Sequence, residues 1–200
     1  MGKYLKEFAT HAEYQAYING GEAILPNVSI CDDQSTHVHY NPTSDWLSVT
    51  YQVVTTEEDT PLFDSYGMYG KGVVGMEVDG VMLSTVQNTY RFDTGGEHVV
   101  RYKLEDQTKI NEYLFFPYTI SNMFITKVEI PENYVTIEHK AICTSADEGT
   151  DIYMHSKTPP EVANNPFGKV RNIYVPAESV NLYKTAPNWS EYAEHIVAMP

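Results

Sequence analysis

The sequence contains few basic residues. Thirteen lysines and arginines stand against 27 aspartates and glutamates, so the formal net charge is −14. A chain with this charge repels phosphate backbones and anionic lipid. The composition therefore excludes nucleic acid and an anionic membrane surface as partners.

Long apolar runs and a secretion signal are also missing. No apolar stretch approaches the roughly 18 to 20 residues that a membrane-spanning helix needs, so we expect no membrane insertion. Residues 1–7 turn polar at once and lack the apolar segment of a signal peptide. If Met1 is the native start, we expect the protein to be made and kept in a cytoplasm until the cell lyses.

Cysteine is scarce as well. Cys31 and Cys143 are the two cysteines of the chain, and they lie too far apart to form a metal-binding or redox spacing. We interpret both as buried free thiols.

A short apolar-x-apolar unit recurs in the last third of the chain. It occurs at Val128–Ile130, Ile152–Met154 and Ile173–Val175, with first residues 24 and then 21 positions apart. Each unit predicts one short strand with both apolar residues on one face, and the spacing lies within the roughly 20 to 29 residues of a leucine-rich repeat. We expect these strands to stack as a small solenoid, although three strands of an ordinary sheet joined by long loops would give the same pattern.

The residues around the first unit resemble a known repeat. The run from Ile125 to Ile137, followed by Ala141 and Cys143, is similar to BspA-type leucine-rich repeats, and the segment from Thr158 to Trp189 resembles the end of such an array. The usual Ile-Gly and Ala-Phe pairs are absent, which suggests one degenerate repeat followed by two terminal ones. The resemblance implies a β-solenoid over residues 119–200.

Residues 1–42 have a different pattern. Thr10 to Glu13 fits a capping box and Gly20–Gly21 a stop, so a short helix is predicted over 9–21, and strands are predicted over 24–31 and 37–40. The segments Lys6 to Tyr17, Leu25 to Ser29 and Val38 to Pro42 resemble an N-terminal module of structural proteins from phages of gut anaerobes. That resemblance implies an attachment segment on a virion component.

Residues 43–118 alternate between apolar and polar positions over longer runs. Strands are predicted over 47–53, 89–92 and 97–104, and a hairpin over 76–83, where Asp79-Gly80 stands between apolar pairs. The run from Tyr90 to Tyr102 is similar to the closing strands of small immunoglobulin-like and PKD-type modules. We therefore expect a compact β-sandwich that leads into the solenoid through residues 113–118.

Helical patterns close the chain. Residues 178–183 and part of 188–197 look helical, and Ser190 to Ile196 is expected to cover the open end of the last coil. The predicted fold is thus mainly β: an N-terminal helix and hairpin, an immunoglobulin-like sandwich, a short leucine-rich-repeat-type solenoid and a helical cap.

No residues are predicted to form a catalytic, cofactor or metal site, and we do not expect an enzyme. His37 and His39 share a strand face but lack an evident third ligand. The acidic groups at 32–33, 57–59 and 147–151 lack the spacing of an oxygen-ligand loop, and a solvated loop is their simpler interpretation. A Gly-x-Ser-x-Gly motif and a phosphate-binding glycine loop are absent.

Aromatic residues are the remaining signal for function, because tyrosine is favoured at protein interfaces. Most are expected to pack in the core and a minority to form a contact patch for a protein or a sugar, although the sequence does not say which. The candidates are Tyr66, Tyr69, Tyr113, Phe115, Phe116, Tyr118, Tyr153, Tyr174, Tyr183 and Trp189.

The expected function is that of a non-catalytic phage virion protein. Residues 1–42 would bind other virion proteins of the capsid or tail, and the remainder would project as a head fibre, a capsid decoration or a tail-associated appendage. A homo-oligomer is expected, for which a trimer is one option. The alternative is a BspA-like bacterial surface adhesin that binds a host surface protein or a glycan, which requires export.

Overall fold

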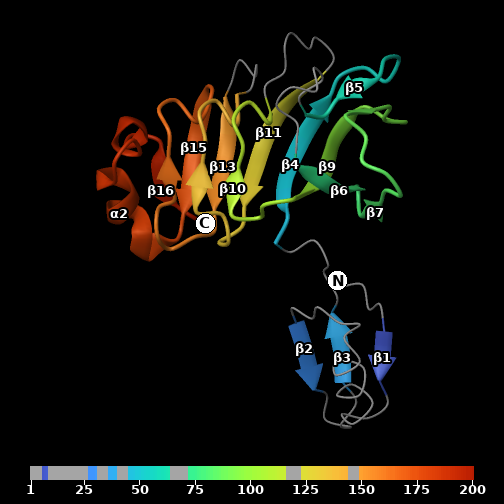
Figure 1. Ribbon diagram of the computed structural model, residues 1–200, viewed down its shortest axis with the longest axis horizontal. Coiled ribbons are helices and arrows are strands. Elements are labelled where there is room, and N and C mark those ends of the chain that lie inside the picture. The colour runs from blue at the N-terminus through green and yellow to red at the C-terminus, as the bar shows by residue number, and fades with distance from the viewer. Residues whose placement is uncertain are drawn as a thin grey trace. The chain divides into compact units, whose positions relative to one another are not determined.

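The computed structural model describes residues 45–63, 72–115, 123–143 and 149–200, together with the backbone of three earlier strands. The chain divides into two compact units, Met1–Ser44 and Asp45–Pro200. In the first unit, β1 (Lys6–Phe8), β3 (Thr36–His39) and β2 (Asn27–Ile30) form an antiparallel sheet in that order (Figure 1). The predicted pairing of the two later strands is confirmed, β1 was not predicted, and the helix predicted over 9–21 lies outside the described residues.

One mixed sheet runs through the second unit. Its eight strands follow the order β16-β15-β13-β11-β4-β9-β6-β7 (Figure 1). The strands from β11 to β16 are parallel, whereas those from β11 to β7 are antiparallel. Their bounds are β4 Leu47–Val53, β6 Val73–Val78, β7 Val81–Met82, β9 Gly96–Leu104, β11 Met123–Ile130, β13 Thr150–Met154, β15 Val170–Val175 and β16 Ile196–Ala198.

The three apolar-x-apolar units are adjacent parallel strands. Val128 pairs with Ile152, and Ile152 pairs with Ile173, so the spacing seen in the sequence is the register of the sheet. A fourth strand continues this row, because Ile173 also pairs with Ile196. The prediction that the last helical segment runs to Ile196 is therefore wrong at its end. The helical part is η2 (Ser190–Tyr192), and Ile196 begins β16.

A second, smaller sheet backs the parallel strands. It contains β10 (Lys109–Ile110), β12 (Thr136–Ile137) and β14 (Glu161–Val162), all parallel. Single bridges also link Phe115 to Ile142 and Ile142 to Phe167. The steps from β11 to β13 and from β13 to β15 each add one pairing to all three rows, and the apolar side chains of the rows are buried between them.

The strands predicted before residue 105 are all present. The hairpin of β6 and β7 turns at Asp79-Gly80, where both residues have positive φ, 49° and 80°. A short pair of β5 (Thr60–Pro61) and β8 (Thr89–Tyr90) forms a separate sheet. However, β4, β9, β6 and β7 belong to the same sheet as the parallel strands, and one apolar core extends from Leu47 to Ile196. The border predicted at 118/119 lies outside the described residues.

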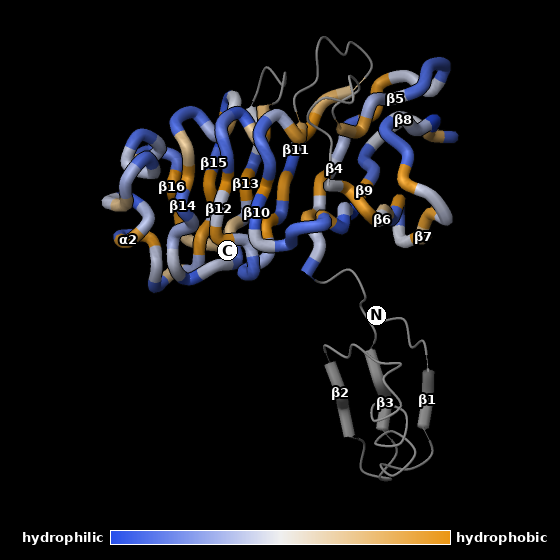
Figure 2. The backbone as a smooth tube through the Cα atoms, in the orientation of Figure 1, coloured by the Kyte–Doolittle hydropathy of each residue, from blue (hydrophilic) through white to orange (hydrophobic). Residues whose placement is uncertain are grey.

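Hydropathy along the chain follows this layout. Figure 2 shows apolar residues along the strands and hydrophilic residues in the turns that join them. Within the described part of the chain, no helix is both long enough and apolar enough to cross a bilayer.

The last turn of the chain packs against the edge strands β14 and β16. It consists of η1 (Ala177–Ser179), α2 (Val180–Thr185) and η2, which include the helix predicted over 178–183. Ile196 has no exposed surface although it begins the edge strand β16. At the edge strand β14, Trp189 Nε1 donates to Pro160 O at 2.8 Å and Asn188 Nδ2 donates to Val162 O at 2.7 Å. These two carbonyls are therefore closed to further strand pairing.

Candidate binding surface

The parallel strands display a row of polar and aromatic side chains on the face turned away from the core. In each apolar-x-apolar unit the middle residue points outward, and these residues, Glu129, Tyr153 and Tyr174, are aligned by the register. We call the following residues the outer strip: Lys127, Glu129, Asp151, Tyr153, Arg171, Asn172 and Tyr174.

Two tyrosines stack at the centre of the outer strip. The rings of Tyr153 and Tyr174 lie 4.4 Å apart between centroids, at 22° to each other. Lys127 Nζ lies 4.6 Å from the Tyr153 centroid and also pairs with Glu129. Because β11 and β15 flank β13, Lys127 and Tyr174 approach the Tyr153 ring from opposite sides. Partial burial, followed by the neighbouring Tyr174, raises the pKa of the Tyr153 hydroxyl.

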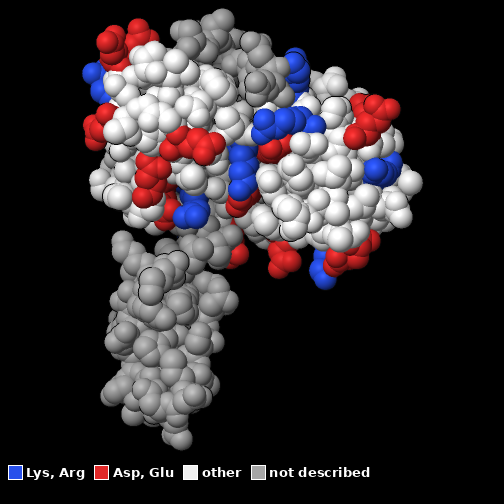
Figure 3. All heavy atoms as spheres, turned by 180° about the vertical axis from the view of Figure 1, so that it is seen from behind, with Lys and Arg blue, Asp and Glu red and all other residues white. Residues whose placement is uncertain are grey.

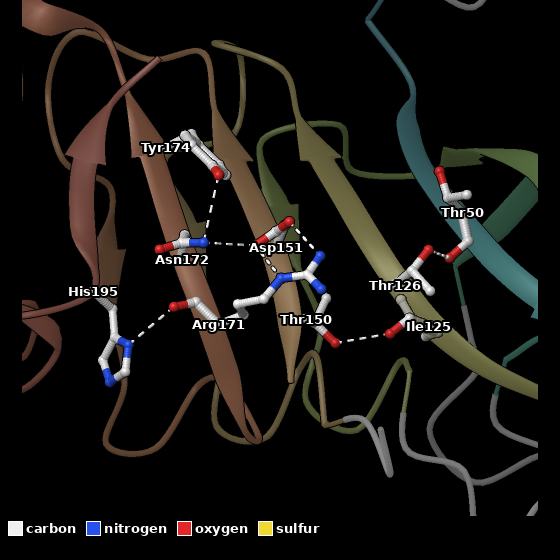
Figure 4. Close-up of polar contacts among 9 residues, drawn as sticks. All are labelled: Thr50, Ile125, Thr126, Thr150, Asp151, Arg171, Asn172, Tyr174 and His195. Atoms are coloured by element: carbon white, nitrogen blue, oxygen red, sulfur yellow. Dashed lines mark hydrogen bonds and ion pairs between the residues drawn. The ribbon is translucent and has the colours of Figure 1, made fainter. Parts of the chain in front are cut away.

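Asp151 is the centre of the polar contacts beside this stack (Figure 4). Arg171 donates to it through Nε at 3.0 Å and Nη2 at 2.5 Å, and Asn172 Nδ2 adds a third bond at 3.2 Å. Asn172 Nδ2 also lies 3.4 Å from the Tyr174 hydroxyl, which connects the ion pair to the tyrosines. Burial alone would raise the pKa of Asp151, but the bonds from Arg171 and Asn172 outweigh it and hold the pKa below its usual value.

This arrangement suits contact with a protein more than contact with a sugar. A sugar ring stacks on an open aromatic face, whereas the Tyr153 ring is enclosed by Tyr174 on one side and Lys127 on the other. Tyr153 therefore presents its ring edge and hydroxyl, which are suited to hydrogen bonding across a protein interface. Each carboxylate of the outer strip already has a cation partner, Lys127 for Glu129 and Arg171 for Asp151.

The aromatic residues that the sequence suggested as contact residues fall into several groups. Phe115, Tyr183 and Trp189 are buried, Tyr153 and Tyr174 lie in the outer strip, and Tyr113 packs edge-on against His139. Tyr66, Tyr69, Phe116 and Tyr118 lie outside the described residues.

Of the polar residues weighed as metal sites, those in the described part of the chain are not brought together. His37 and His39 lie on β3, whose side chains are outside the described residues, as are Cys31, Asp147 and Glu148. Asp59 pairs with Arg91 at 2.8 Å, and Asp151 belongs to the outer strip. Cys143 is half-buried, which raises its pKa. Among the described residues, no group of three or more His, Cys, Asp or Glu could hold a metal ion.

The ion pairs and hydrogen bonds of the outer strip were missed from the sequence. The spacing of the apolar residues predicts which strands lie side by side. The residue between the two apolar residues of each unit was the only sequence feature that could have indicated the outward-facing row. Arg171 and Asp151 are 20 residues apart, so their pairing depends on the register of two successive coils. That register slips by one residue between Thr150 and Asp151.

Charges of both signs are interspersed on one face of the second unit. On the face shown in Figure 3, Lys and Arg side chains lie beside Asp and Glu side chains, with neutral surface between the groups. Lys109 pairs with Glu138 at 2.6 Å and Lys157 with Glu178 at 2.9 Å. A polyanion would therefore meet a carboxylate beside each of these cations.

Comparison with known proteins gives no family. The sequence matches no protein-family model, and no curated protein matches it significantly.

Proposed function

We propose that the protein is a non-catalytic structural protein of a phage virion, attached through residues 1–42 and projecting through the rest of the chain. The observation that carries this proposal is the division into two compact units at Ser44/Asp45. A separate small unit at the N-terminus suits a segment that binds a neighbouring capsid or tail protein. The larger unit, organised around one eight-stranded sheet, suits a rigid appendage such as a head fibre or a decoration protein.

We also propose that residues 119–200 form a leucine-rich-repeat-type solenoid. Its support is the repeated parallel register Val128, Ile152, Ile173, together with the second row through β12 and β14. The immunoglobulin-like sandwich proposed for residues 43–118 has less support. A sandwich needs two facing sheets, but β4, β6, β7 and β9 all lie in the eight-stranded sheet, and β5 and β8 form only a two-stranded pair beside it.

The outer strip favours a second candidate, a surface adhesin or protein-binding module. The stacked Tyr153 and Tyr174 form a rigid patch beside hydrogen-bonding groups, as contact surfaces often do. Export would be required for this role. A signal peptide or lipoprotein cysteine encoded upstream of Met1 would favour the adhesin over the virion protein.

The molar mass in solution tests the role of the N-terminal unit. The full chain is compared with a chain that starts at Thr43, which keeps Trp46, Leu47 and every other buried residue of the second unit. We expect the full chain to form a larger assembly than the shorter one. Equal assembly states with equal stability would contradict the attachment role and favour the adhesin.

A further inference from the structure

One buried histidine holds two loops of the second unit. His98 lies on β9 with 9% of its surface exposed. Its Nδ1 lies 2.7 Å from Asp79 Oδ2, in the turn between β6 and β7, and its Nε2 lies 2.9 Å from Thr94 O, in the loop between β8 and β9. A single imidazole ring therefore connects both loops to the sheet.

Both partners of this ring are hydrogen-bond acceptors. A backbone carbonyl and an ionised carboxylate accept but do not donate, so each ring nitrogen needs a proton to bond to its partner. A neutral imidazole has one N–H group, whereas the imidazolium ion has two. The contacts of His98 are thus those of the imidazolium ion, with a charge-assisted bond to Asp79.

The surroundings of the ring suit a positive charge. Asp79 is held toward it, because its Oδ1 accepts from Val99 N–H at 2.8 Å while its Oδ2 faces His98. The Phe92 ring lies 4.3 Å from the imidazole between centroids, at 34°, so part of an aromatic face lies against the imidazole.

Among the described residues, Asp79 is the charged group that contacts His98. The other titratable groups of the adjoining segments are engaged elsewhere or exposed: Tyr51 on β4 donates to Leu62 O, Glu77 on β6 pairs with Arg101, Tyr90 on β8 packs against Phe92, and Asp93 and Glu97 are exposed. A change in the protonation of His98 therefore acts first on its own two contacts.

Thr94 offers the same ring nitrogen a second kind of partner. Its Oγ1 lies 3.5 Å from His98 Nε2, beside the carbonyl oxygen at 2.9 Å. A hydroxyl donates as well as accepts. Once Nε2 has lost its proton, its lone pair repels the carbonyl oxygen but accepts from this hydroxyl after a small shift of residue 94.

We propose that His98 and Thr94 form a pH-sensitive switch in the loop between β8 and β9. In the protonated state, Nε2–H donates to Thr94 O. In the neutral state the remaining proton stays on Nδ1, because the Asp79 carboxylate is the stronger acceptor, and Thr94 Oγ1–H donates to Nε2. A rise in pH therefore moves the backbone at Thr94 while the β6–β7 turn stays attached. The switch does not depend on the role proposed for residues 1–42.

Long-range proton–nitrogen NMR of the nitrogen-15-labelled full chain, from about pH 5 to 8, tests the switch. We expect His98 to carry protons on both nitrogens at the acidic end and on Nδ1 alone at the basic end. The backbone amide signals of residues 94–96 should shift with the same midpoint. His195 is the internal control, because it is exposed and its Nδ1 contacts Arg171 O at 3.1 Å, and its titration should leave those amide signals unchanged.

Variants of the two partners separate their roles. Thr94→Val removes the hydroxyl that stabilises the neutral ring, so His98 should keep its second proton to a pH about one unit higher, whereas Thr94→Ser should titrate as wild type does. Asp79→Asn keeps a residue that tolerates the positive φ of 49° but replaces the carboxylate with an amide. The neutral ring should then carry its proton on Nε2, and the shift of the amide signals at residues 94–96 should be lost.

The tautomer of the wild-type chain is decisive even where a variant fails to fold. A neutral His98 with its proton on Nε2, or a single protonation state across the whole range, would overturn the proposal. So would amide signals of residues 94–96 that do not follow the titration of His98, or a Thr94→Val midpoint equal to that of wild type.

Discussion

Two buried tyrosines share one backbone carbonyl. Tyr51 donates to Leu62 O at 2.6 Å, its hydroxyl lies 2.6 Å from that of Tyr102, and Tyr102 also reaches Leu62 O at 3.2 Å. Both side chains are fully buried, and burial raises the pKa of each hydroxyl. Either hydroxyl alone can satisfy the Leu62 carbonyl, so the two serve as alternative partners for one buried acceptor.

We expect the substitutions Tyr51→Phe and Tyr102→Phe to be non-additive. Each alone should lower the free energy of unfolding by about 1 kcal/mol, because the remaining hydroxyl still donates to Leu62 O. The double variant leaves that carbonyl without a side-chain donor and should cost about 1 to 3 kcal/mol more than the sum. Urea unfolding of the four proteins measures this coupling; a double variant equal to the sum would contradict the shared acceptor.

The lowered pKa of Asp151 makes the stability of the protein depend on pH. Its folded pKa is lowered, so the ionised form contributes stability above the usual carboxyl value of 3.8, and that contribution is lost as the pH falls through the lower folded value. Asp151→Asn should therefore destabilise the protein at pH 7, by about 1 kcal/mol after allowance for the exposure of Arg171. The difference from wild type should shrink at acidic pH. Unfolding free energies across that range test this, and a constant difference would argue against the ion pair as the cause.

At the scale of elements, the start of β13 depends on one glycine. Gly149 has φ of +81°, and a Cβ there would lie 2.9 Å from Arg171 N and 3.0 Å from Val170 C. These are backbone atoms of the neighbouring coil, so they cannot move aside as a flexible side chain would. Close approach of the two coils therefore requires glycine at this position.

Gly149→Ala should destabilise the protein more than Gly80→Ala. Gly80 has φ of +80° but open space around its Cβ position, so it isolates the cost of the left-handed backbone, about 1 kcal/mol. Gly149→Ala adds the clash with the next coil, about 2 kcal/mol more. Chemical denaturation of both variants measures the difference. Equal losses would show that coil contact at Gly149 contributes nothing.

Strands were predictable from the sequence where alternation was long enough to see. The run Leu47 to Val53 and the spacing of Val128, Ile152 and Ile173 gave both strands and register. The strands β10, β12 and β14 have two residues each, which is too short for alternation to appear. Ile196 was predicted to be helical because the residues just before it have a helical pattern. Its place in β16 depends instead on pairing with Ile173, which is distant in the sequence. The outer strip was missed because its contacts join side chains on separate coils.

At the scale of the whole molecule, the antiparallel and parallel halves share one core. The sheet continues from β4 to β11, and the buried apolar cluster includes Leu47 at one end and Ile196 at the other. A sandwich and a solenoid that folded separately would each need a core of their own. The continuous sheet instead predicts that residues 45–200 unfold as one cooperative unit.

The two tryptophans of the chain report on opposite ends of this unit. Trp46 packs beside Gly75 and Lys103 near β6 and β9, whereas Trp189 is buried in the last turn of the chain. In Trp189→Phe the remaining tryptophan fluorescence comes from Trp46. The substitution weakens packing at the other end of the unit, so Trp46 reports whether that loss reaches it. If the unit is cooperative, the urea midpoint read by Trp46 should fall in Trp189→Phe, together with the far-UV circular dichroism signal. If Trp46 in this variant keeps the wild-type urea midpoint while circular dichroism shows a transition at lower urea, the two halves unfold independently.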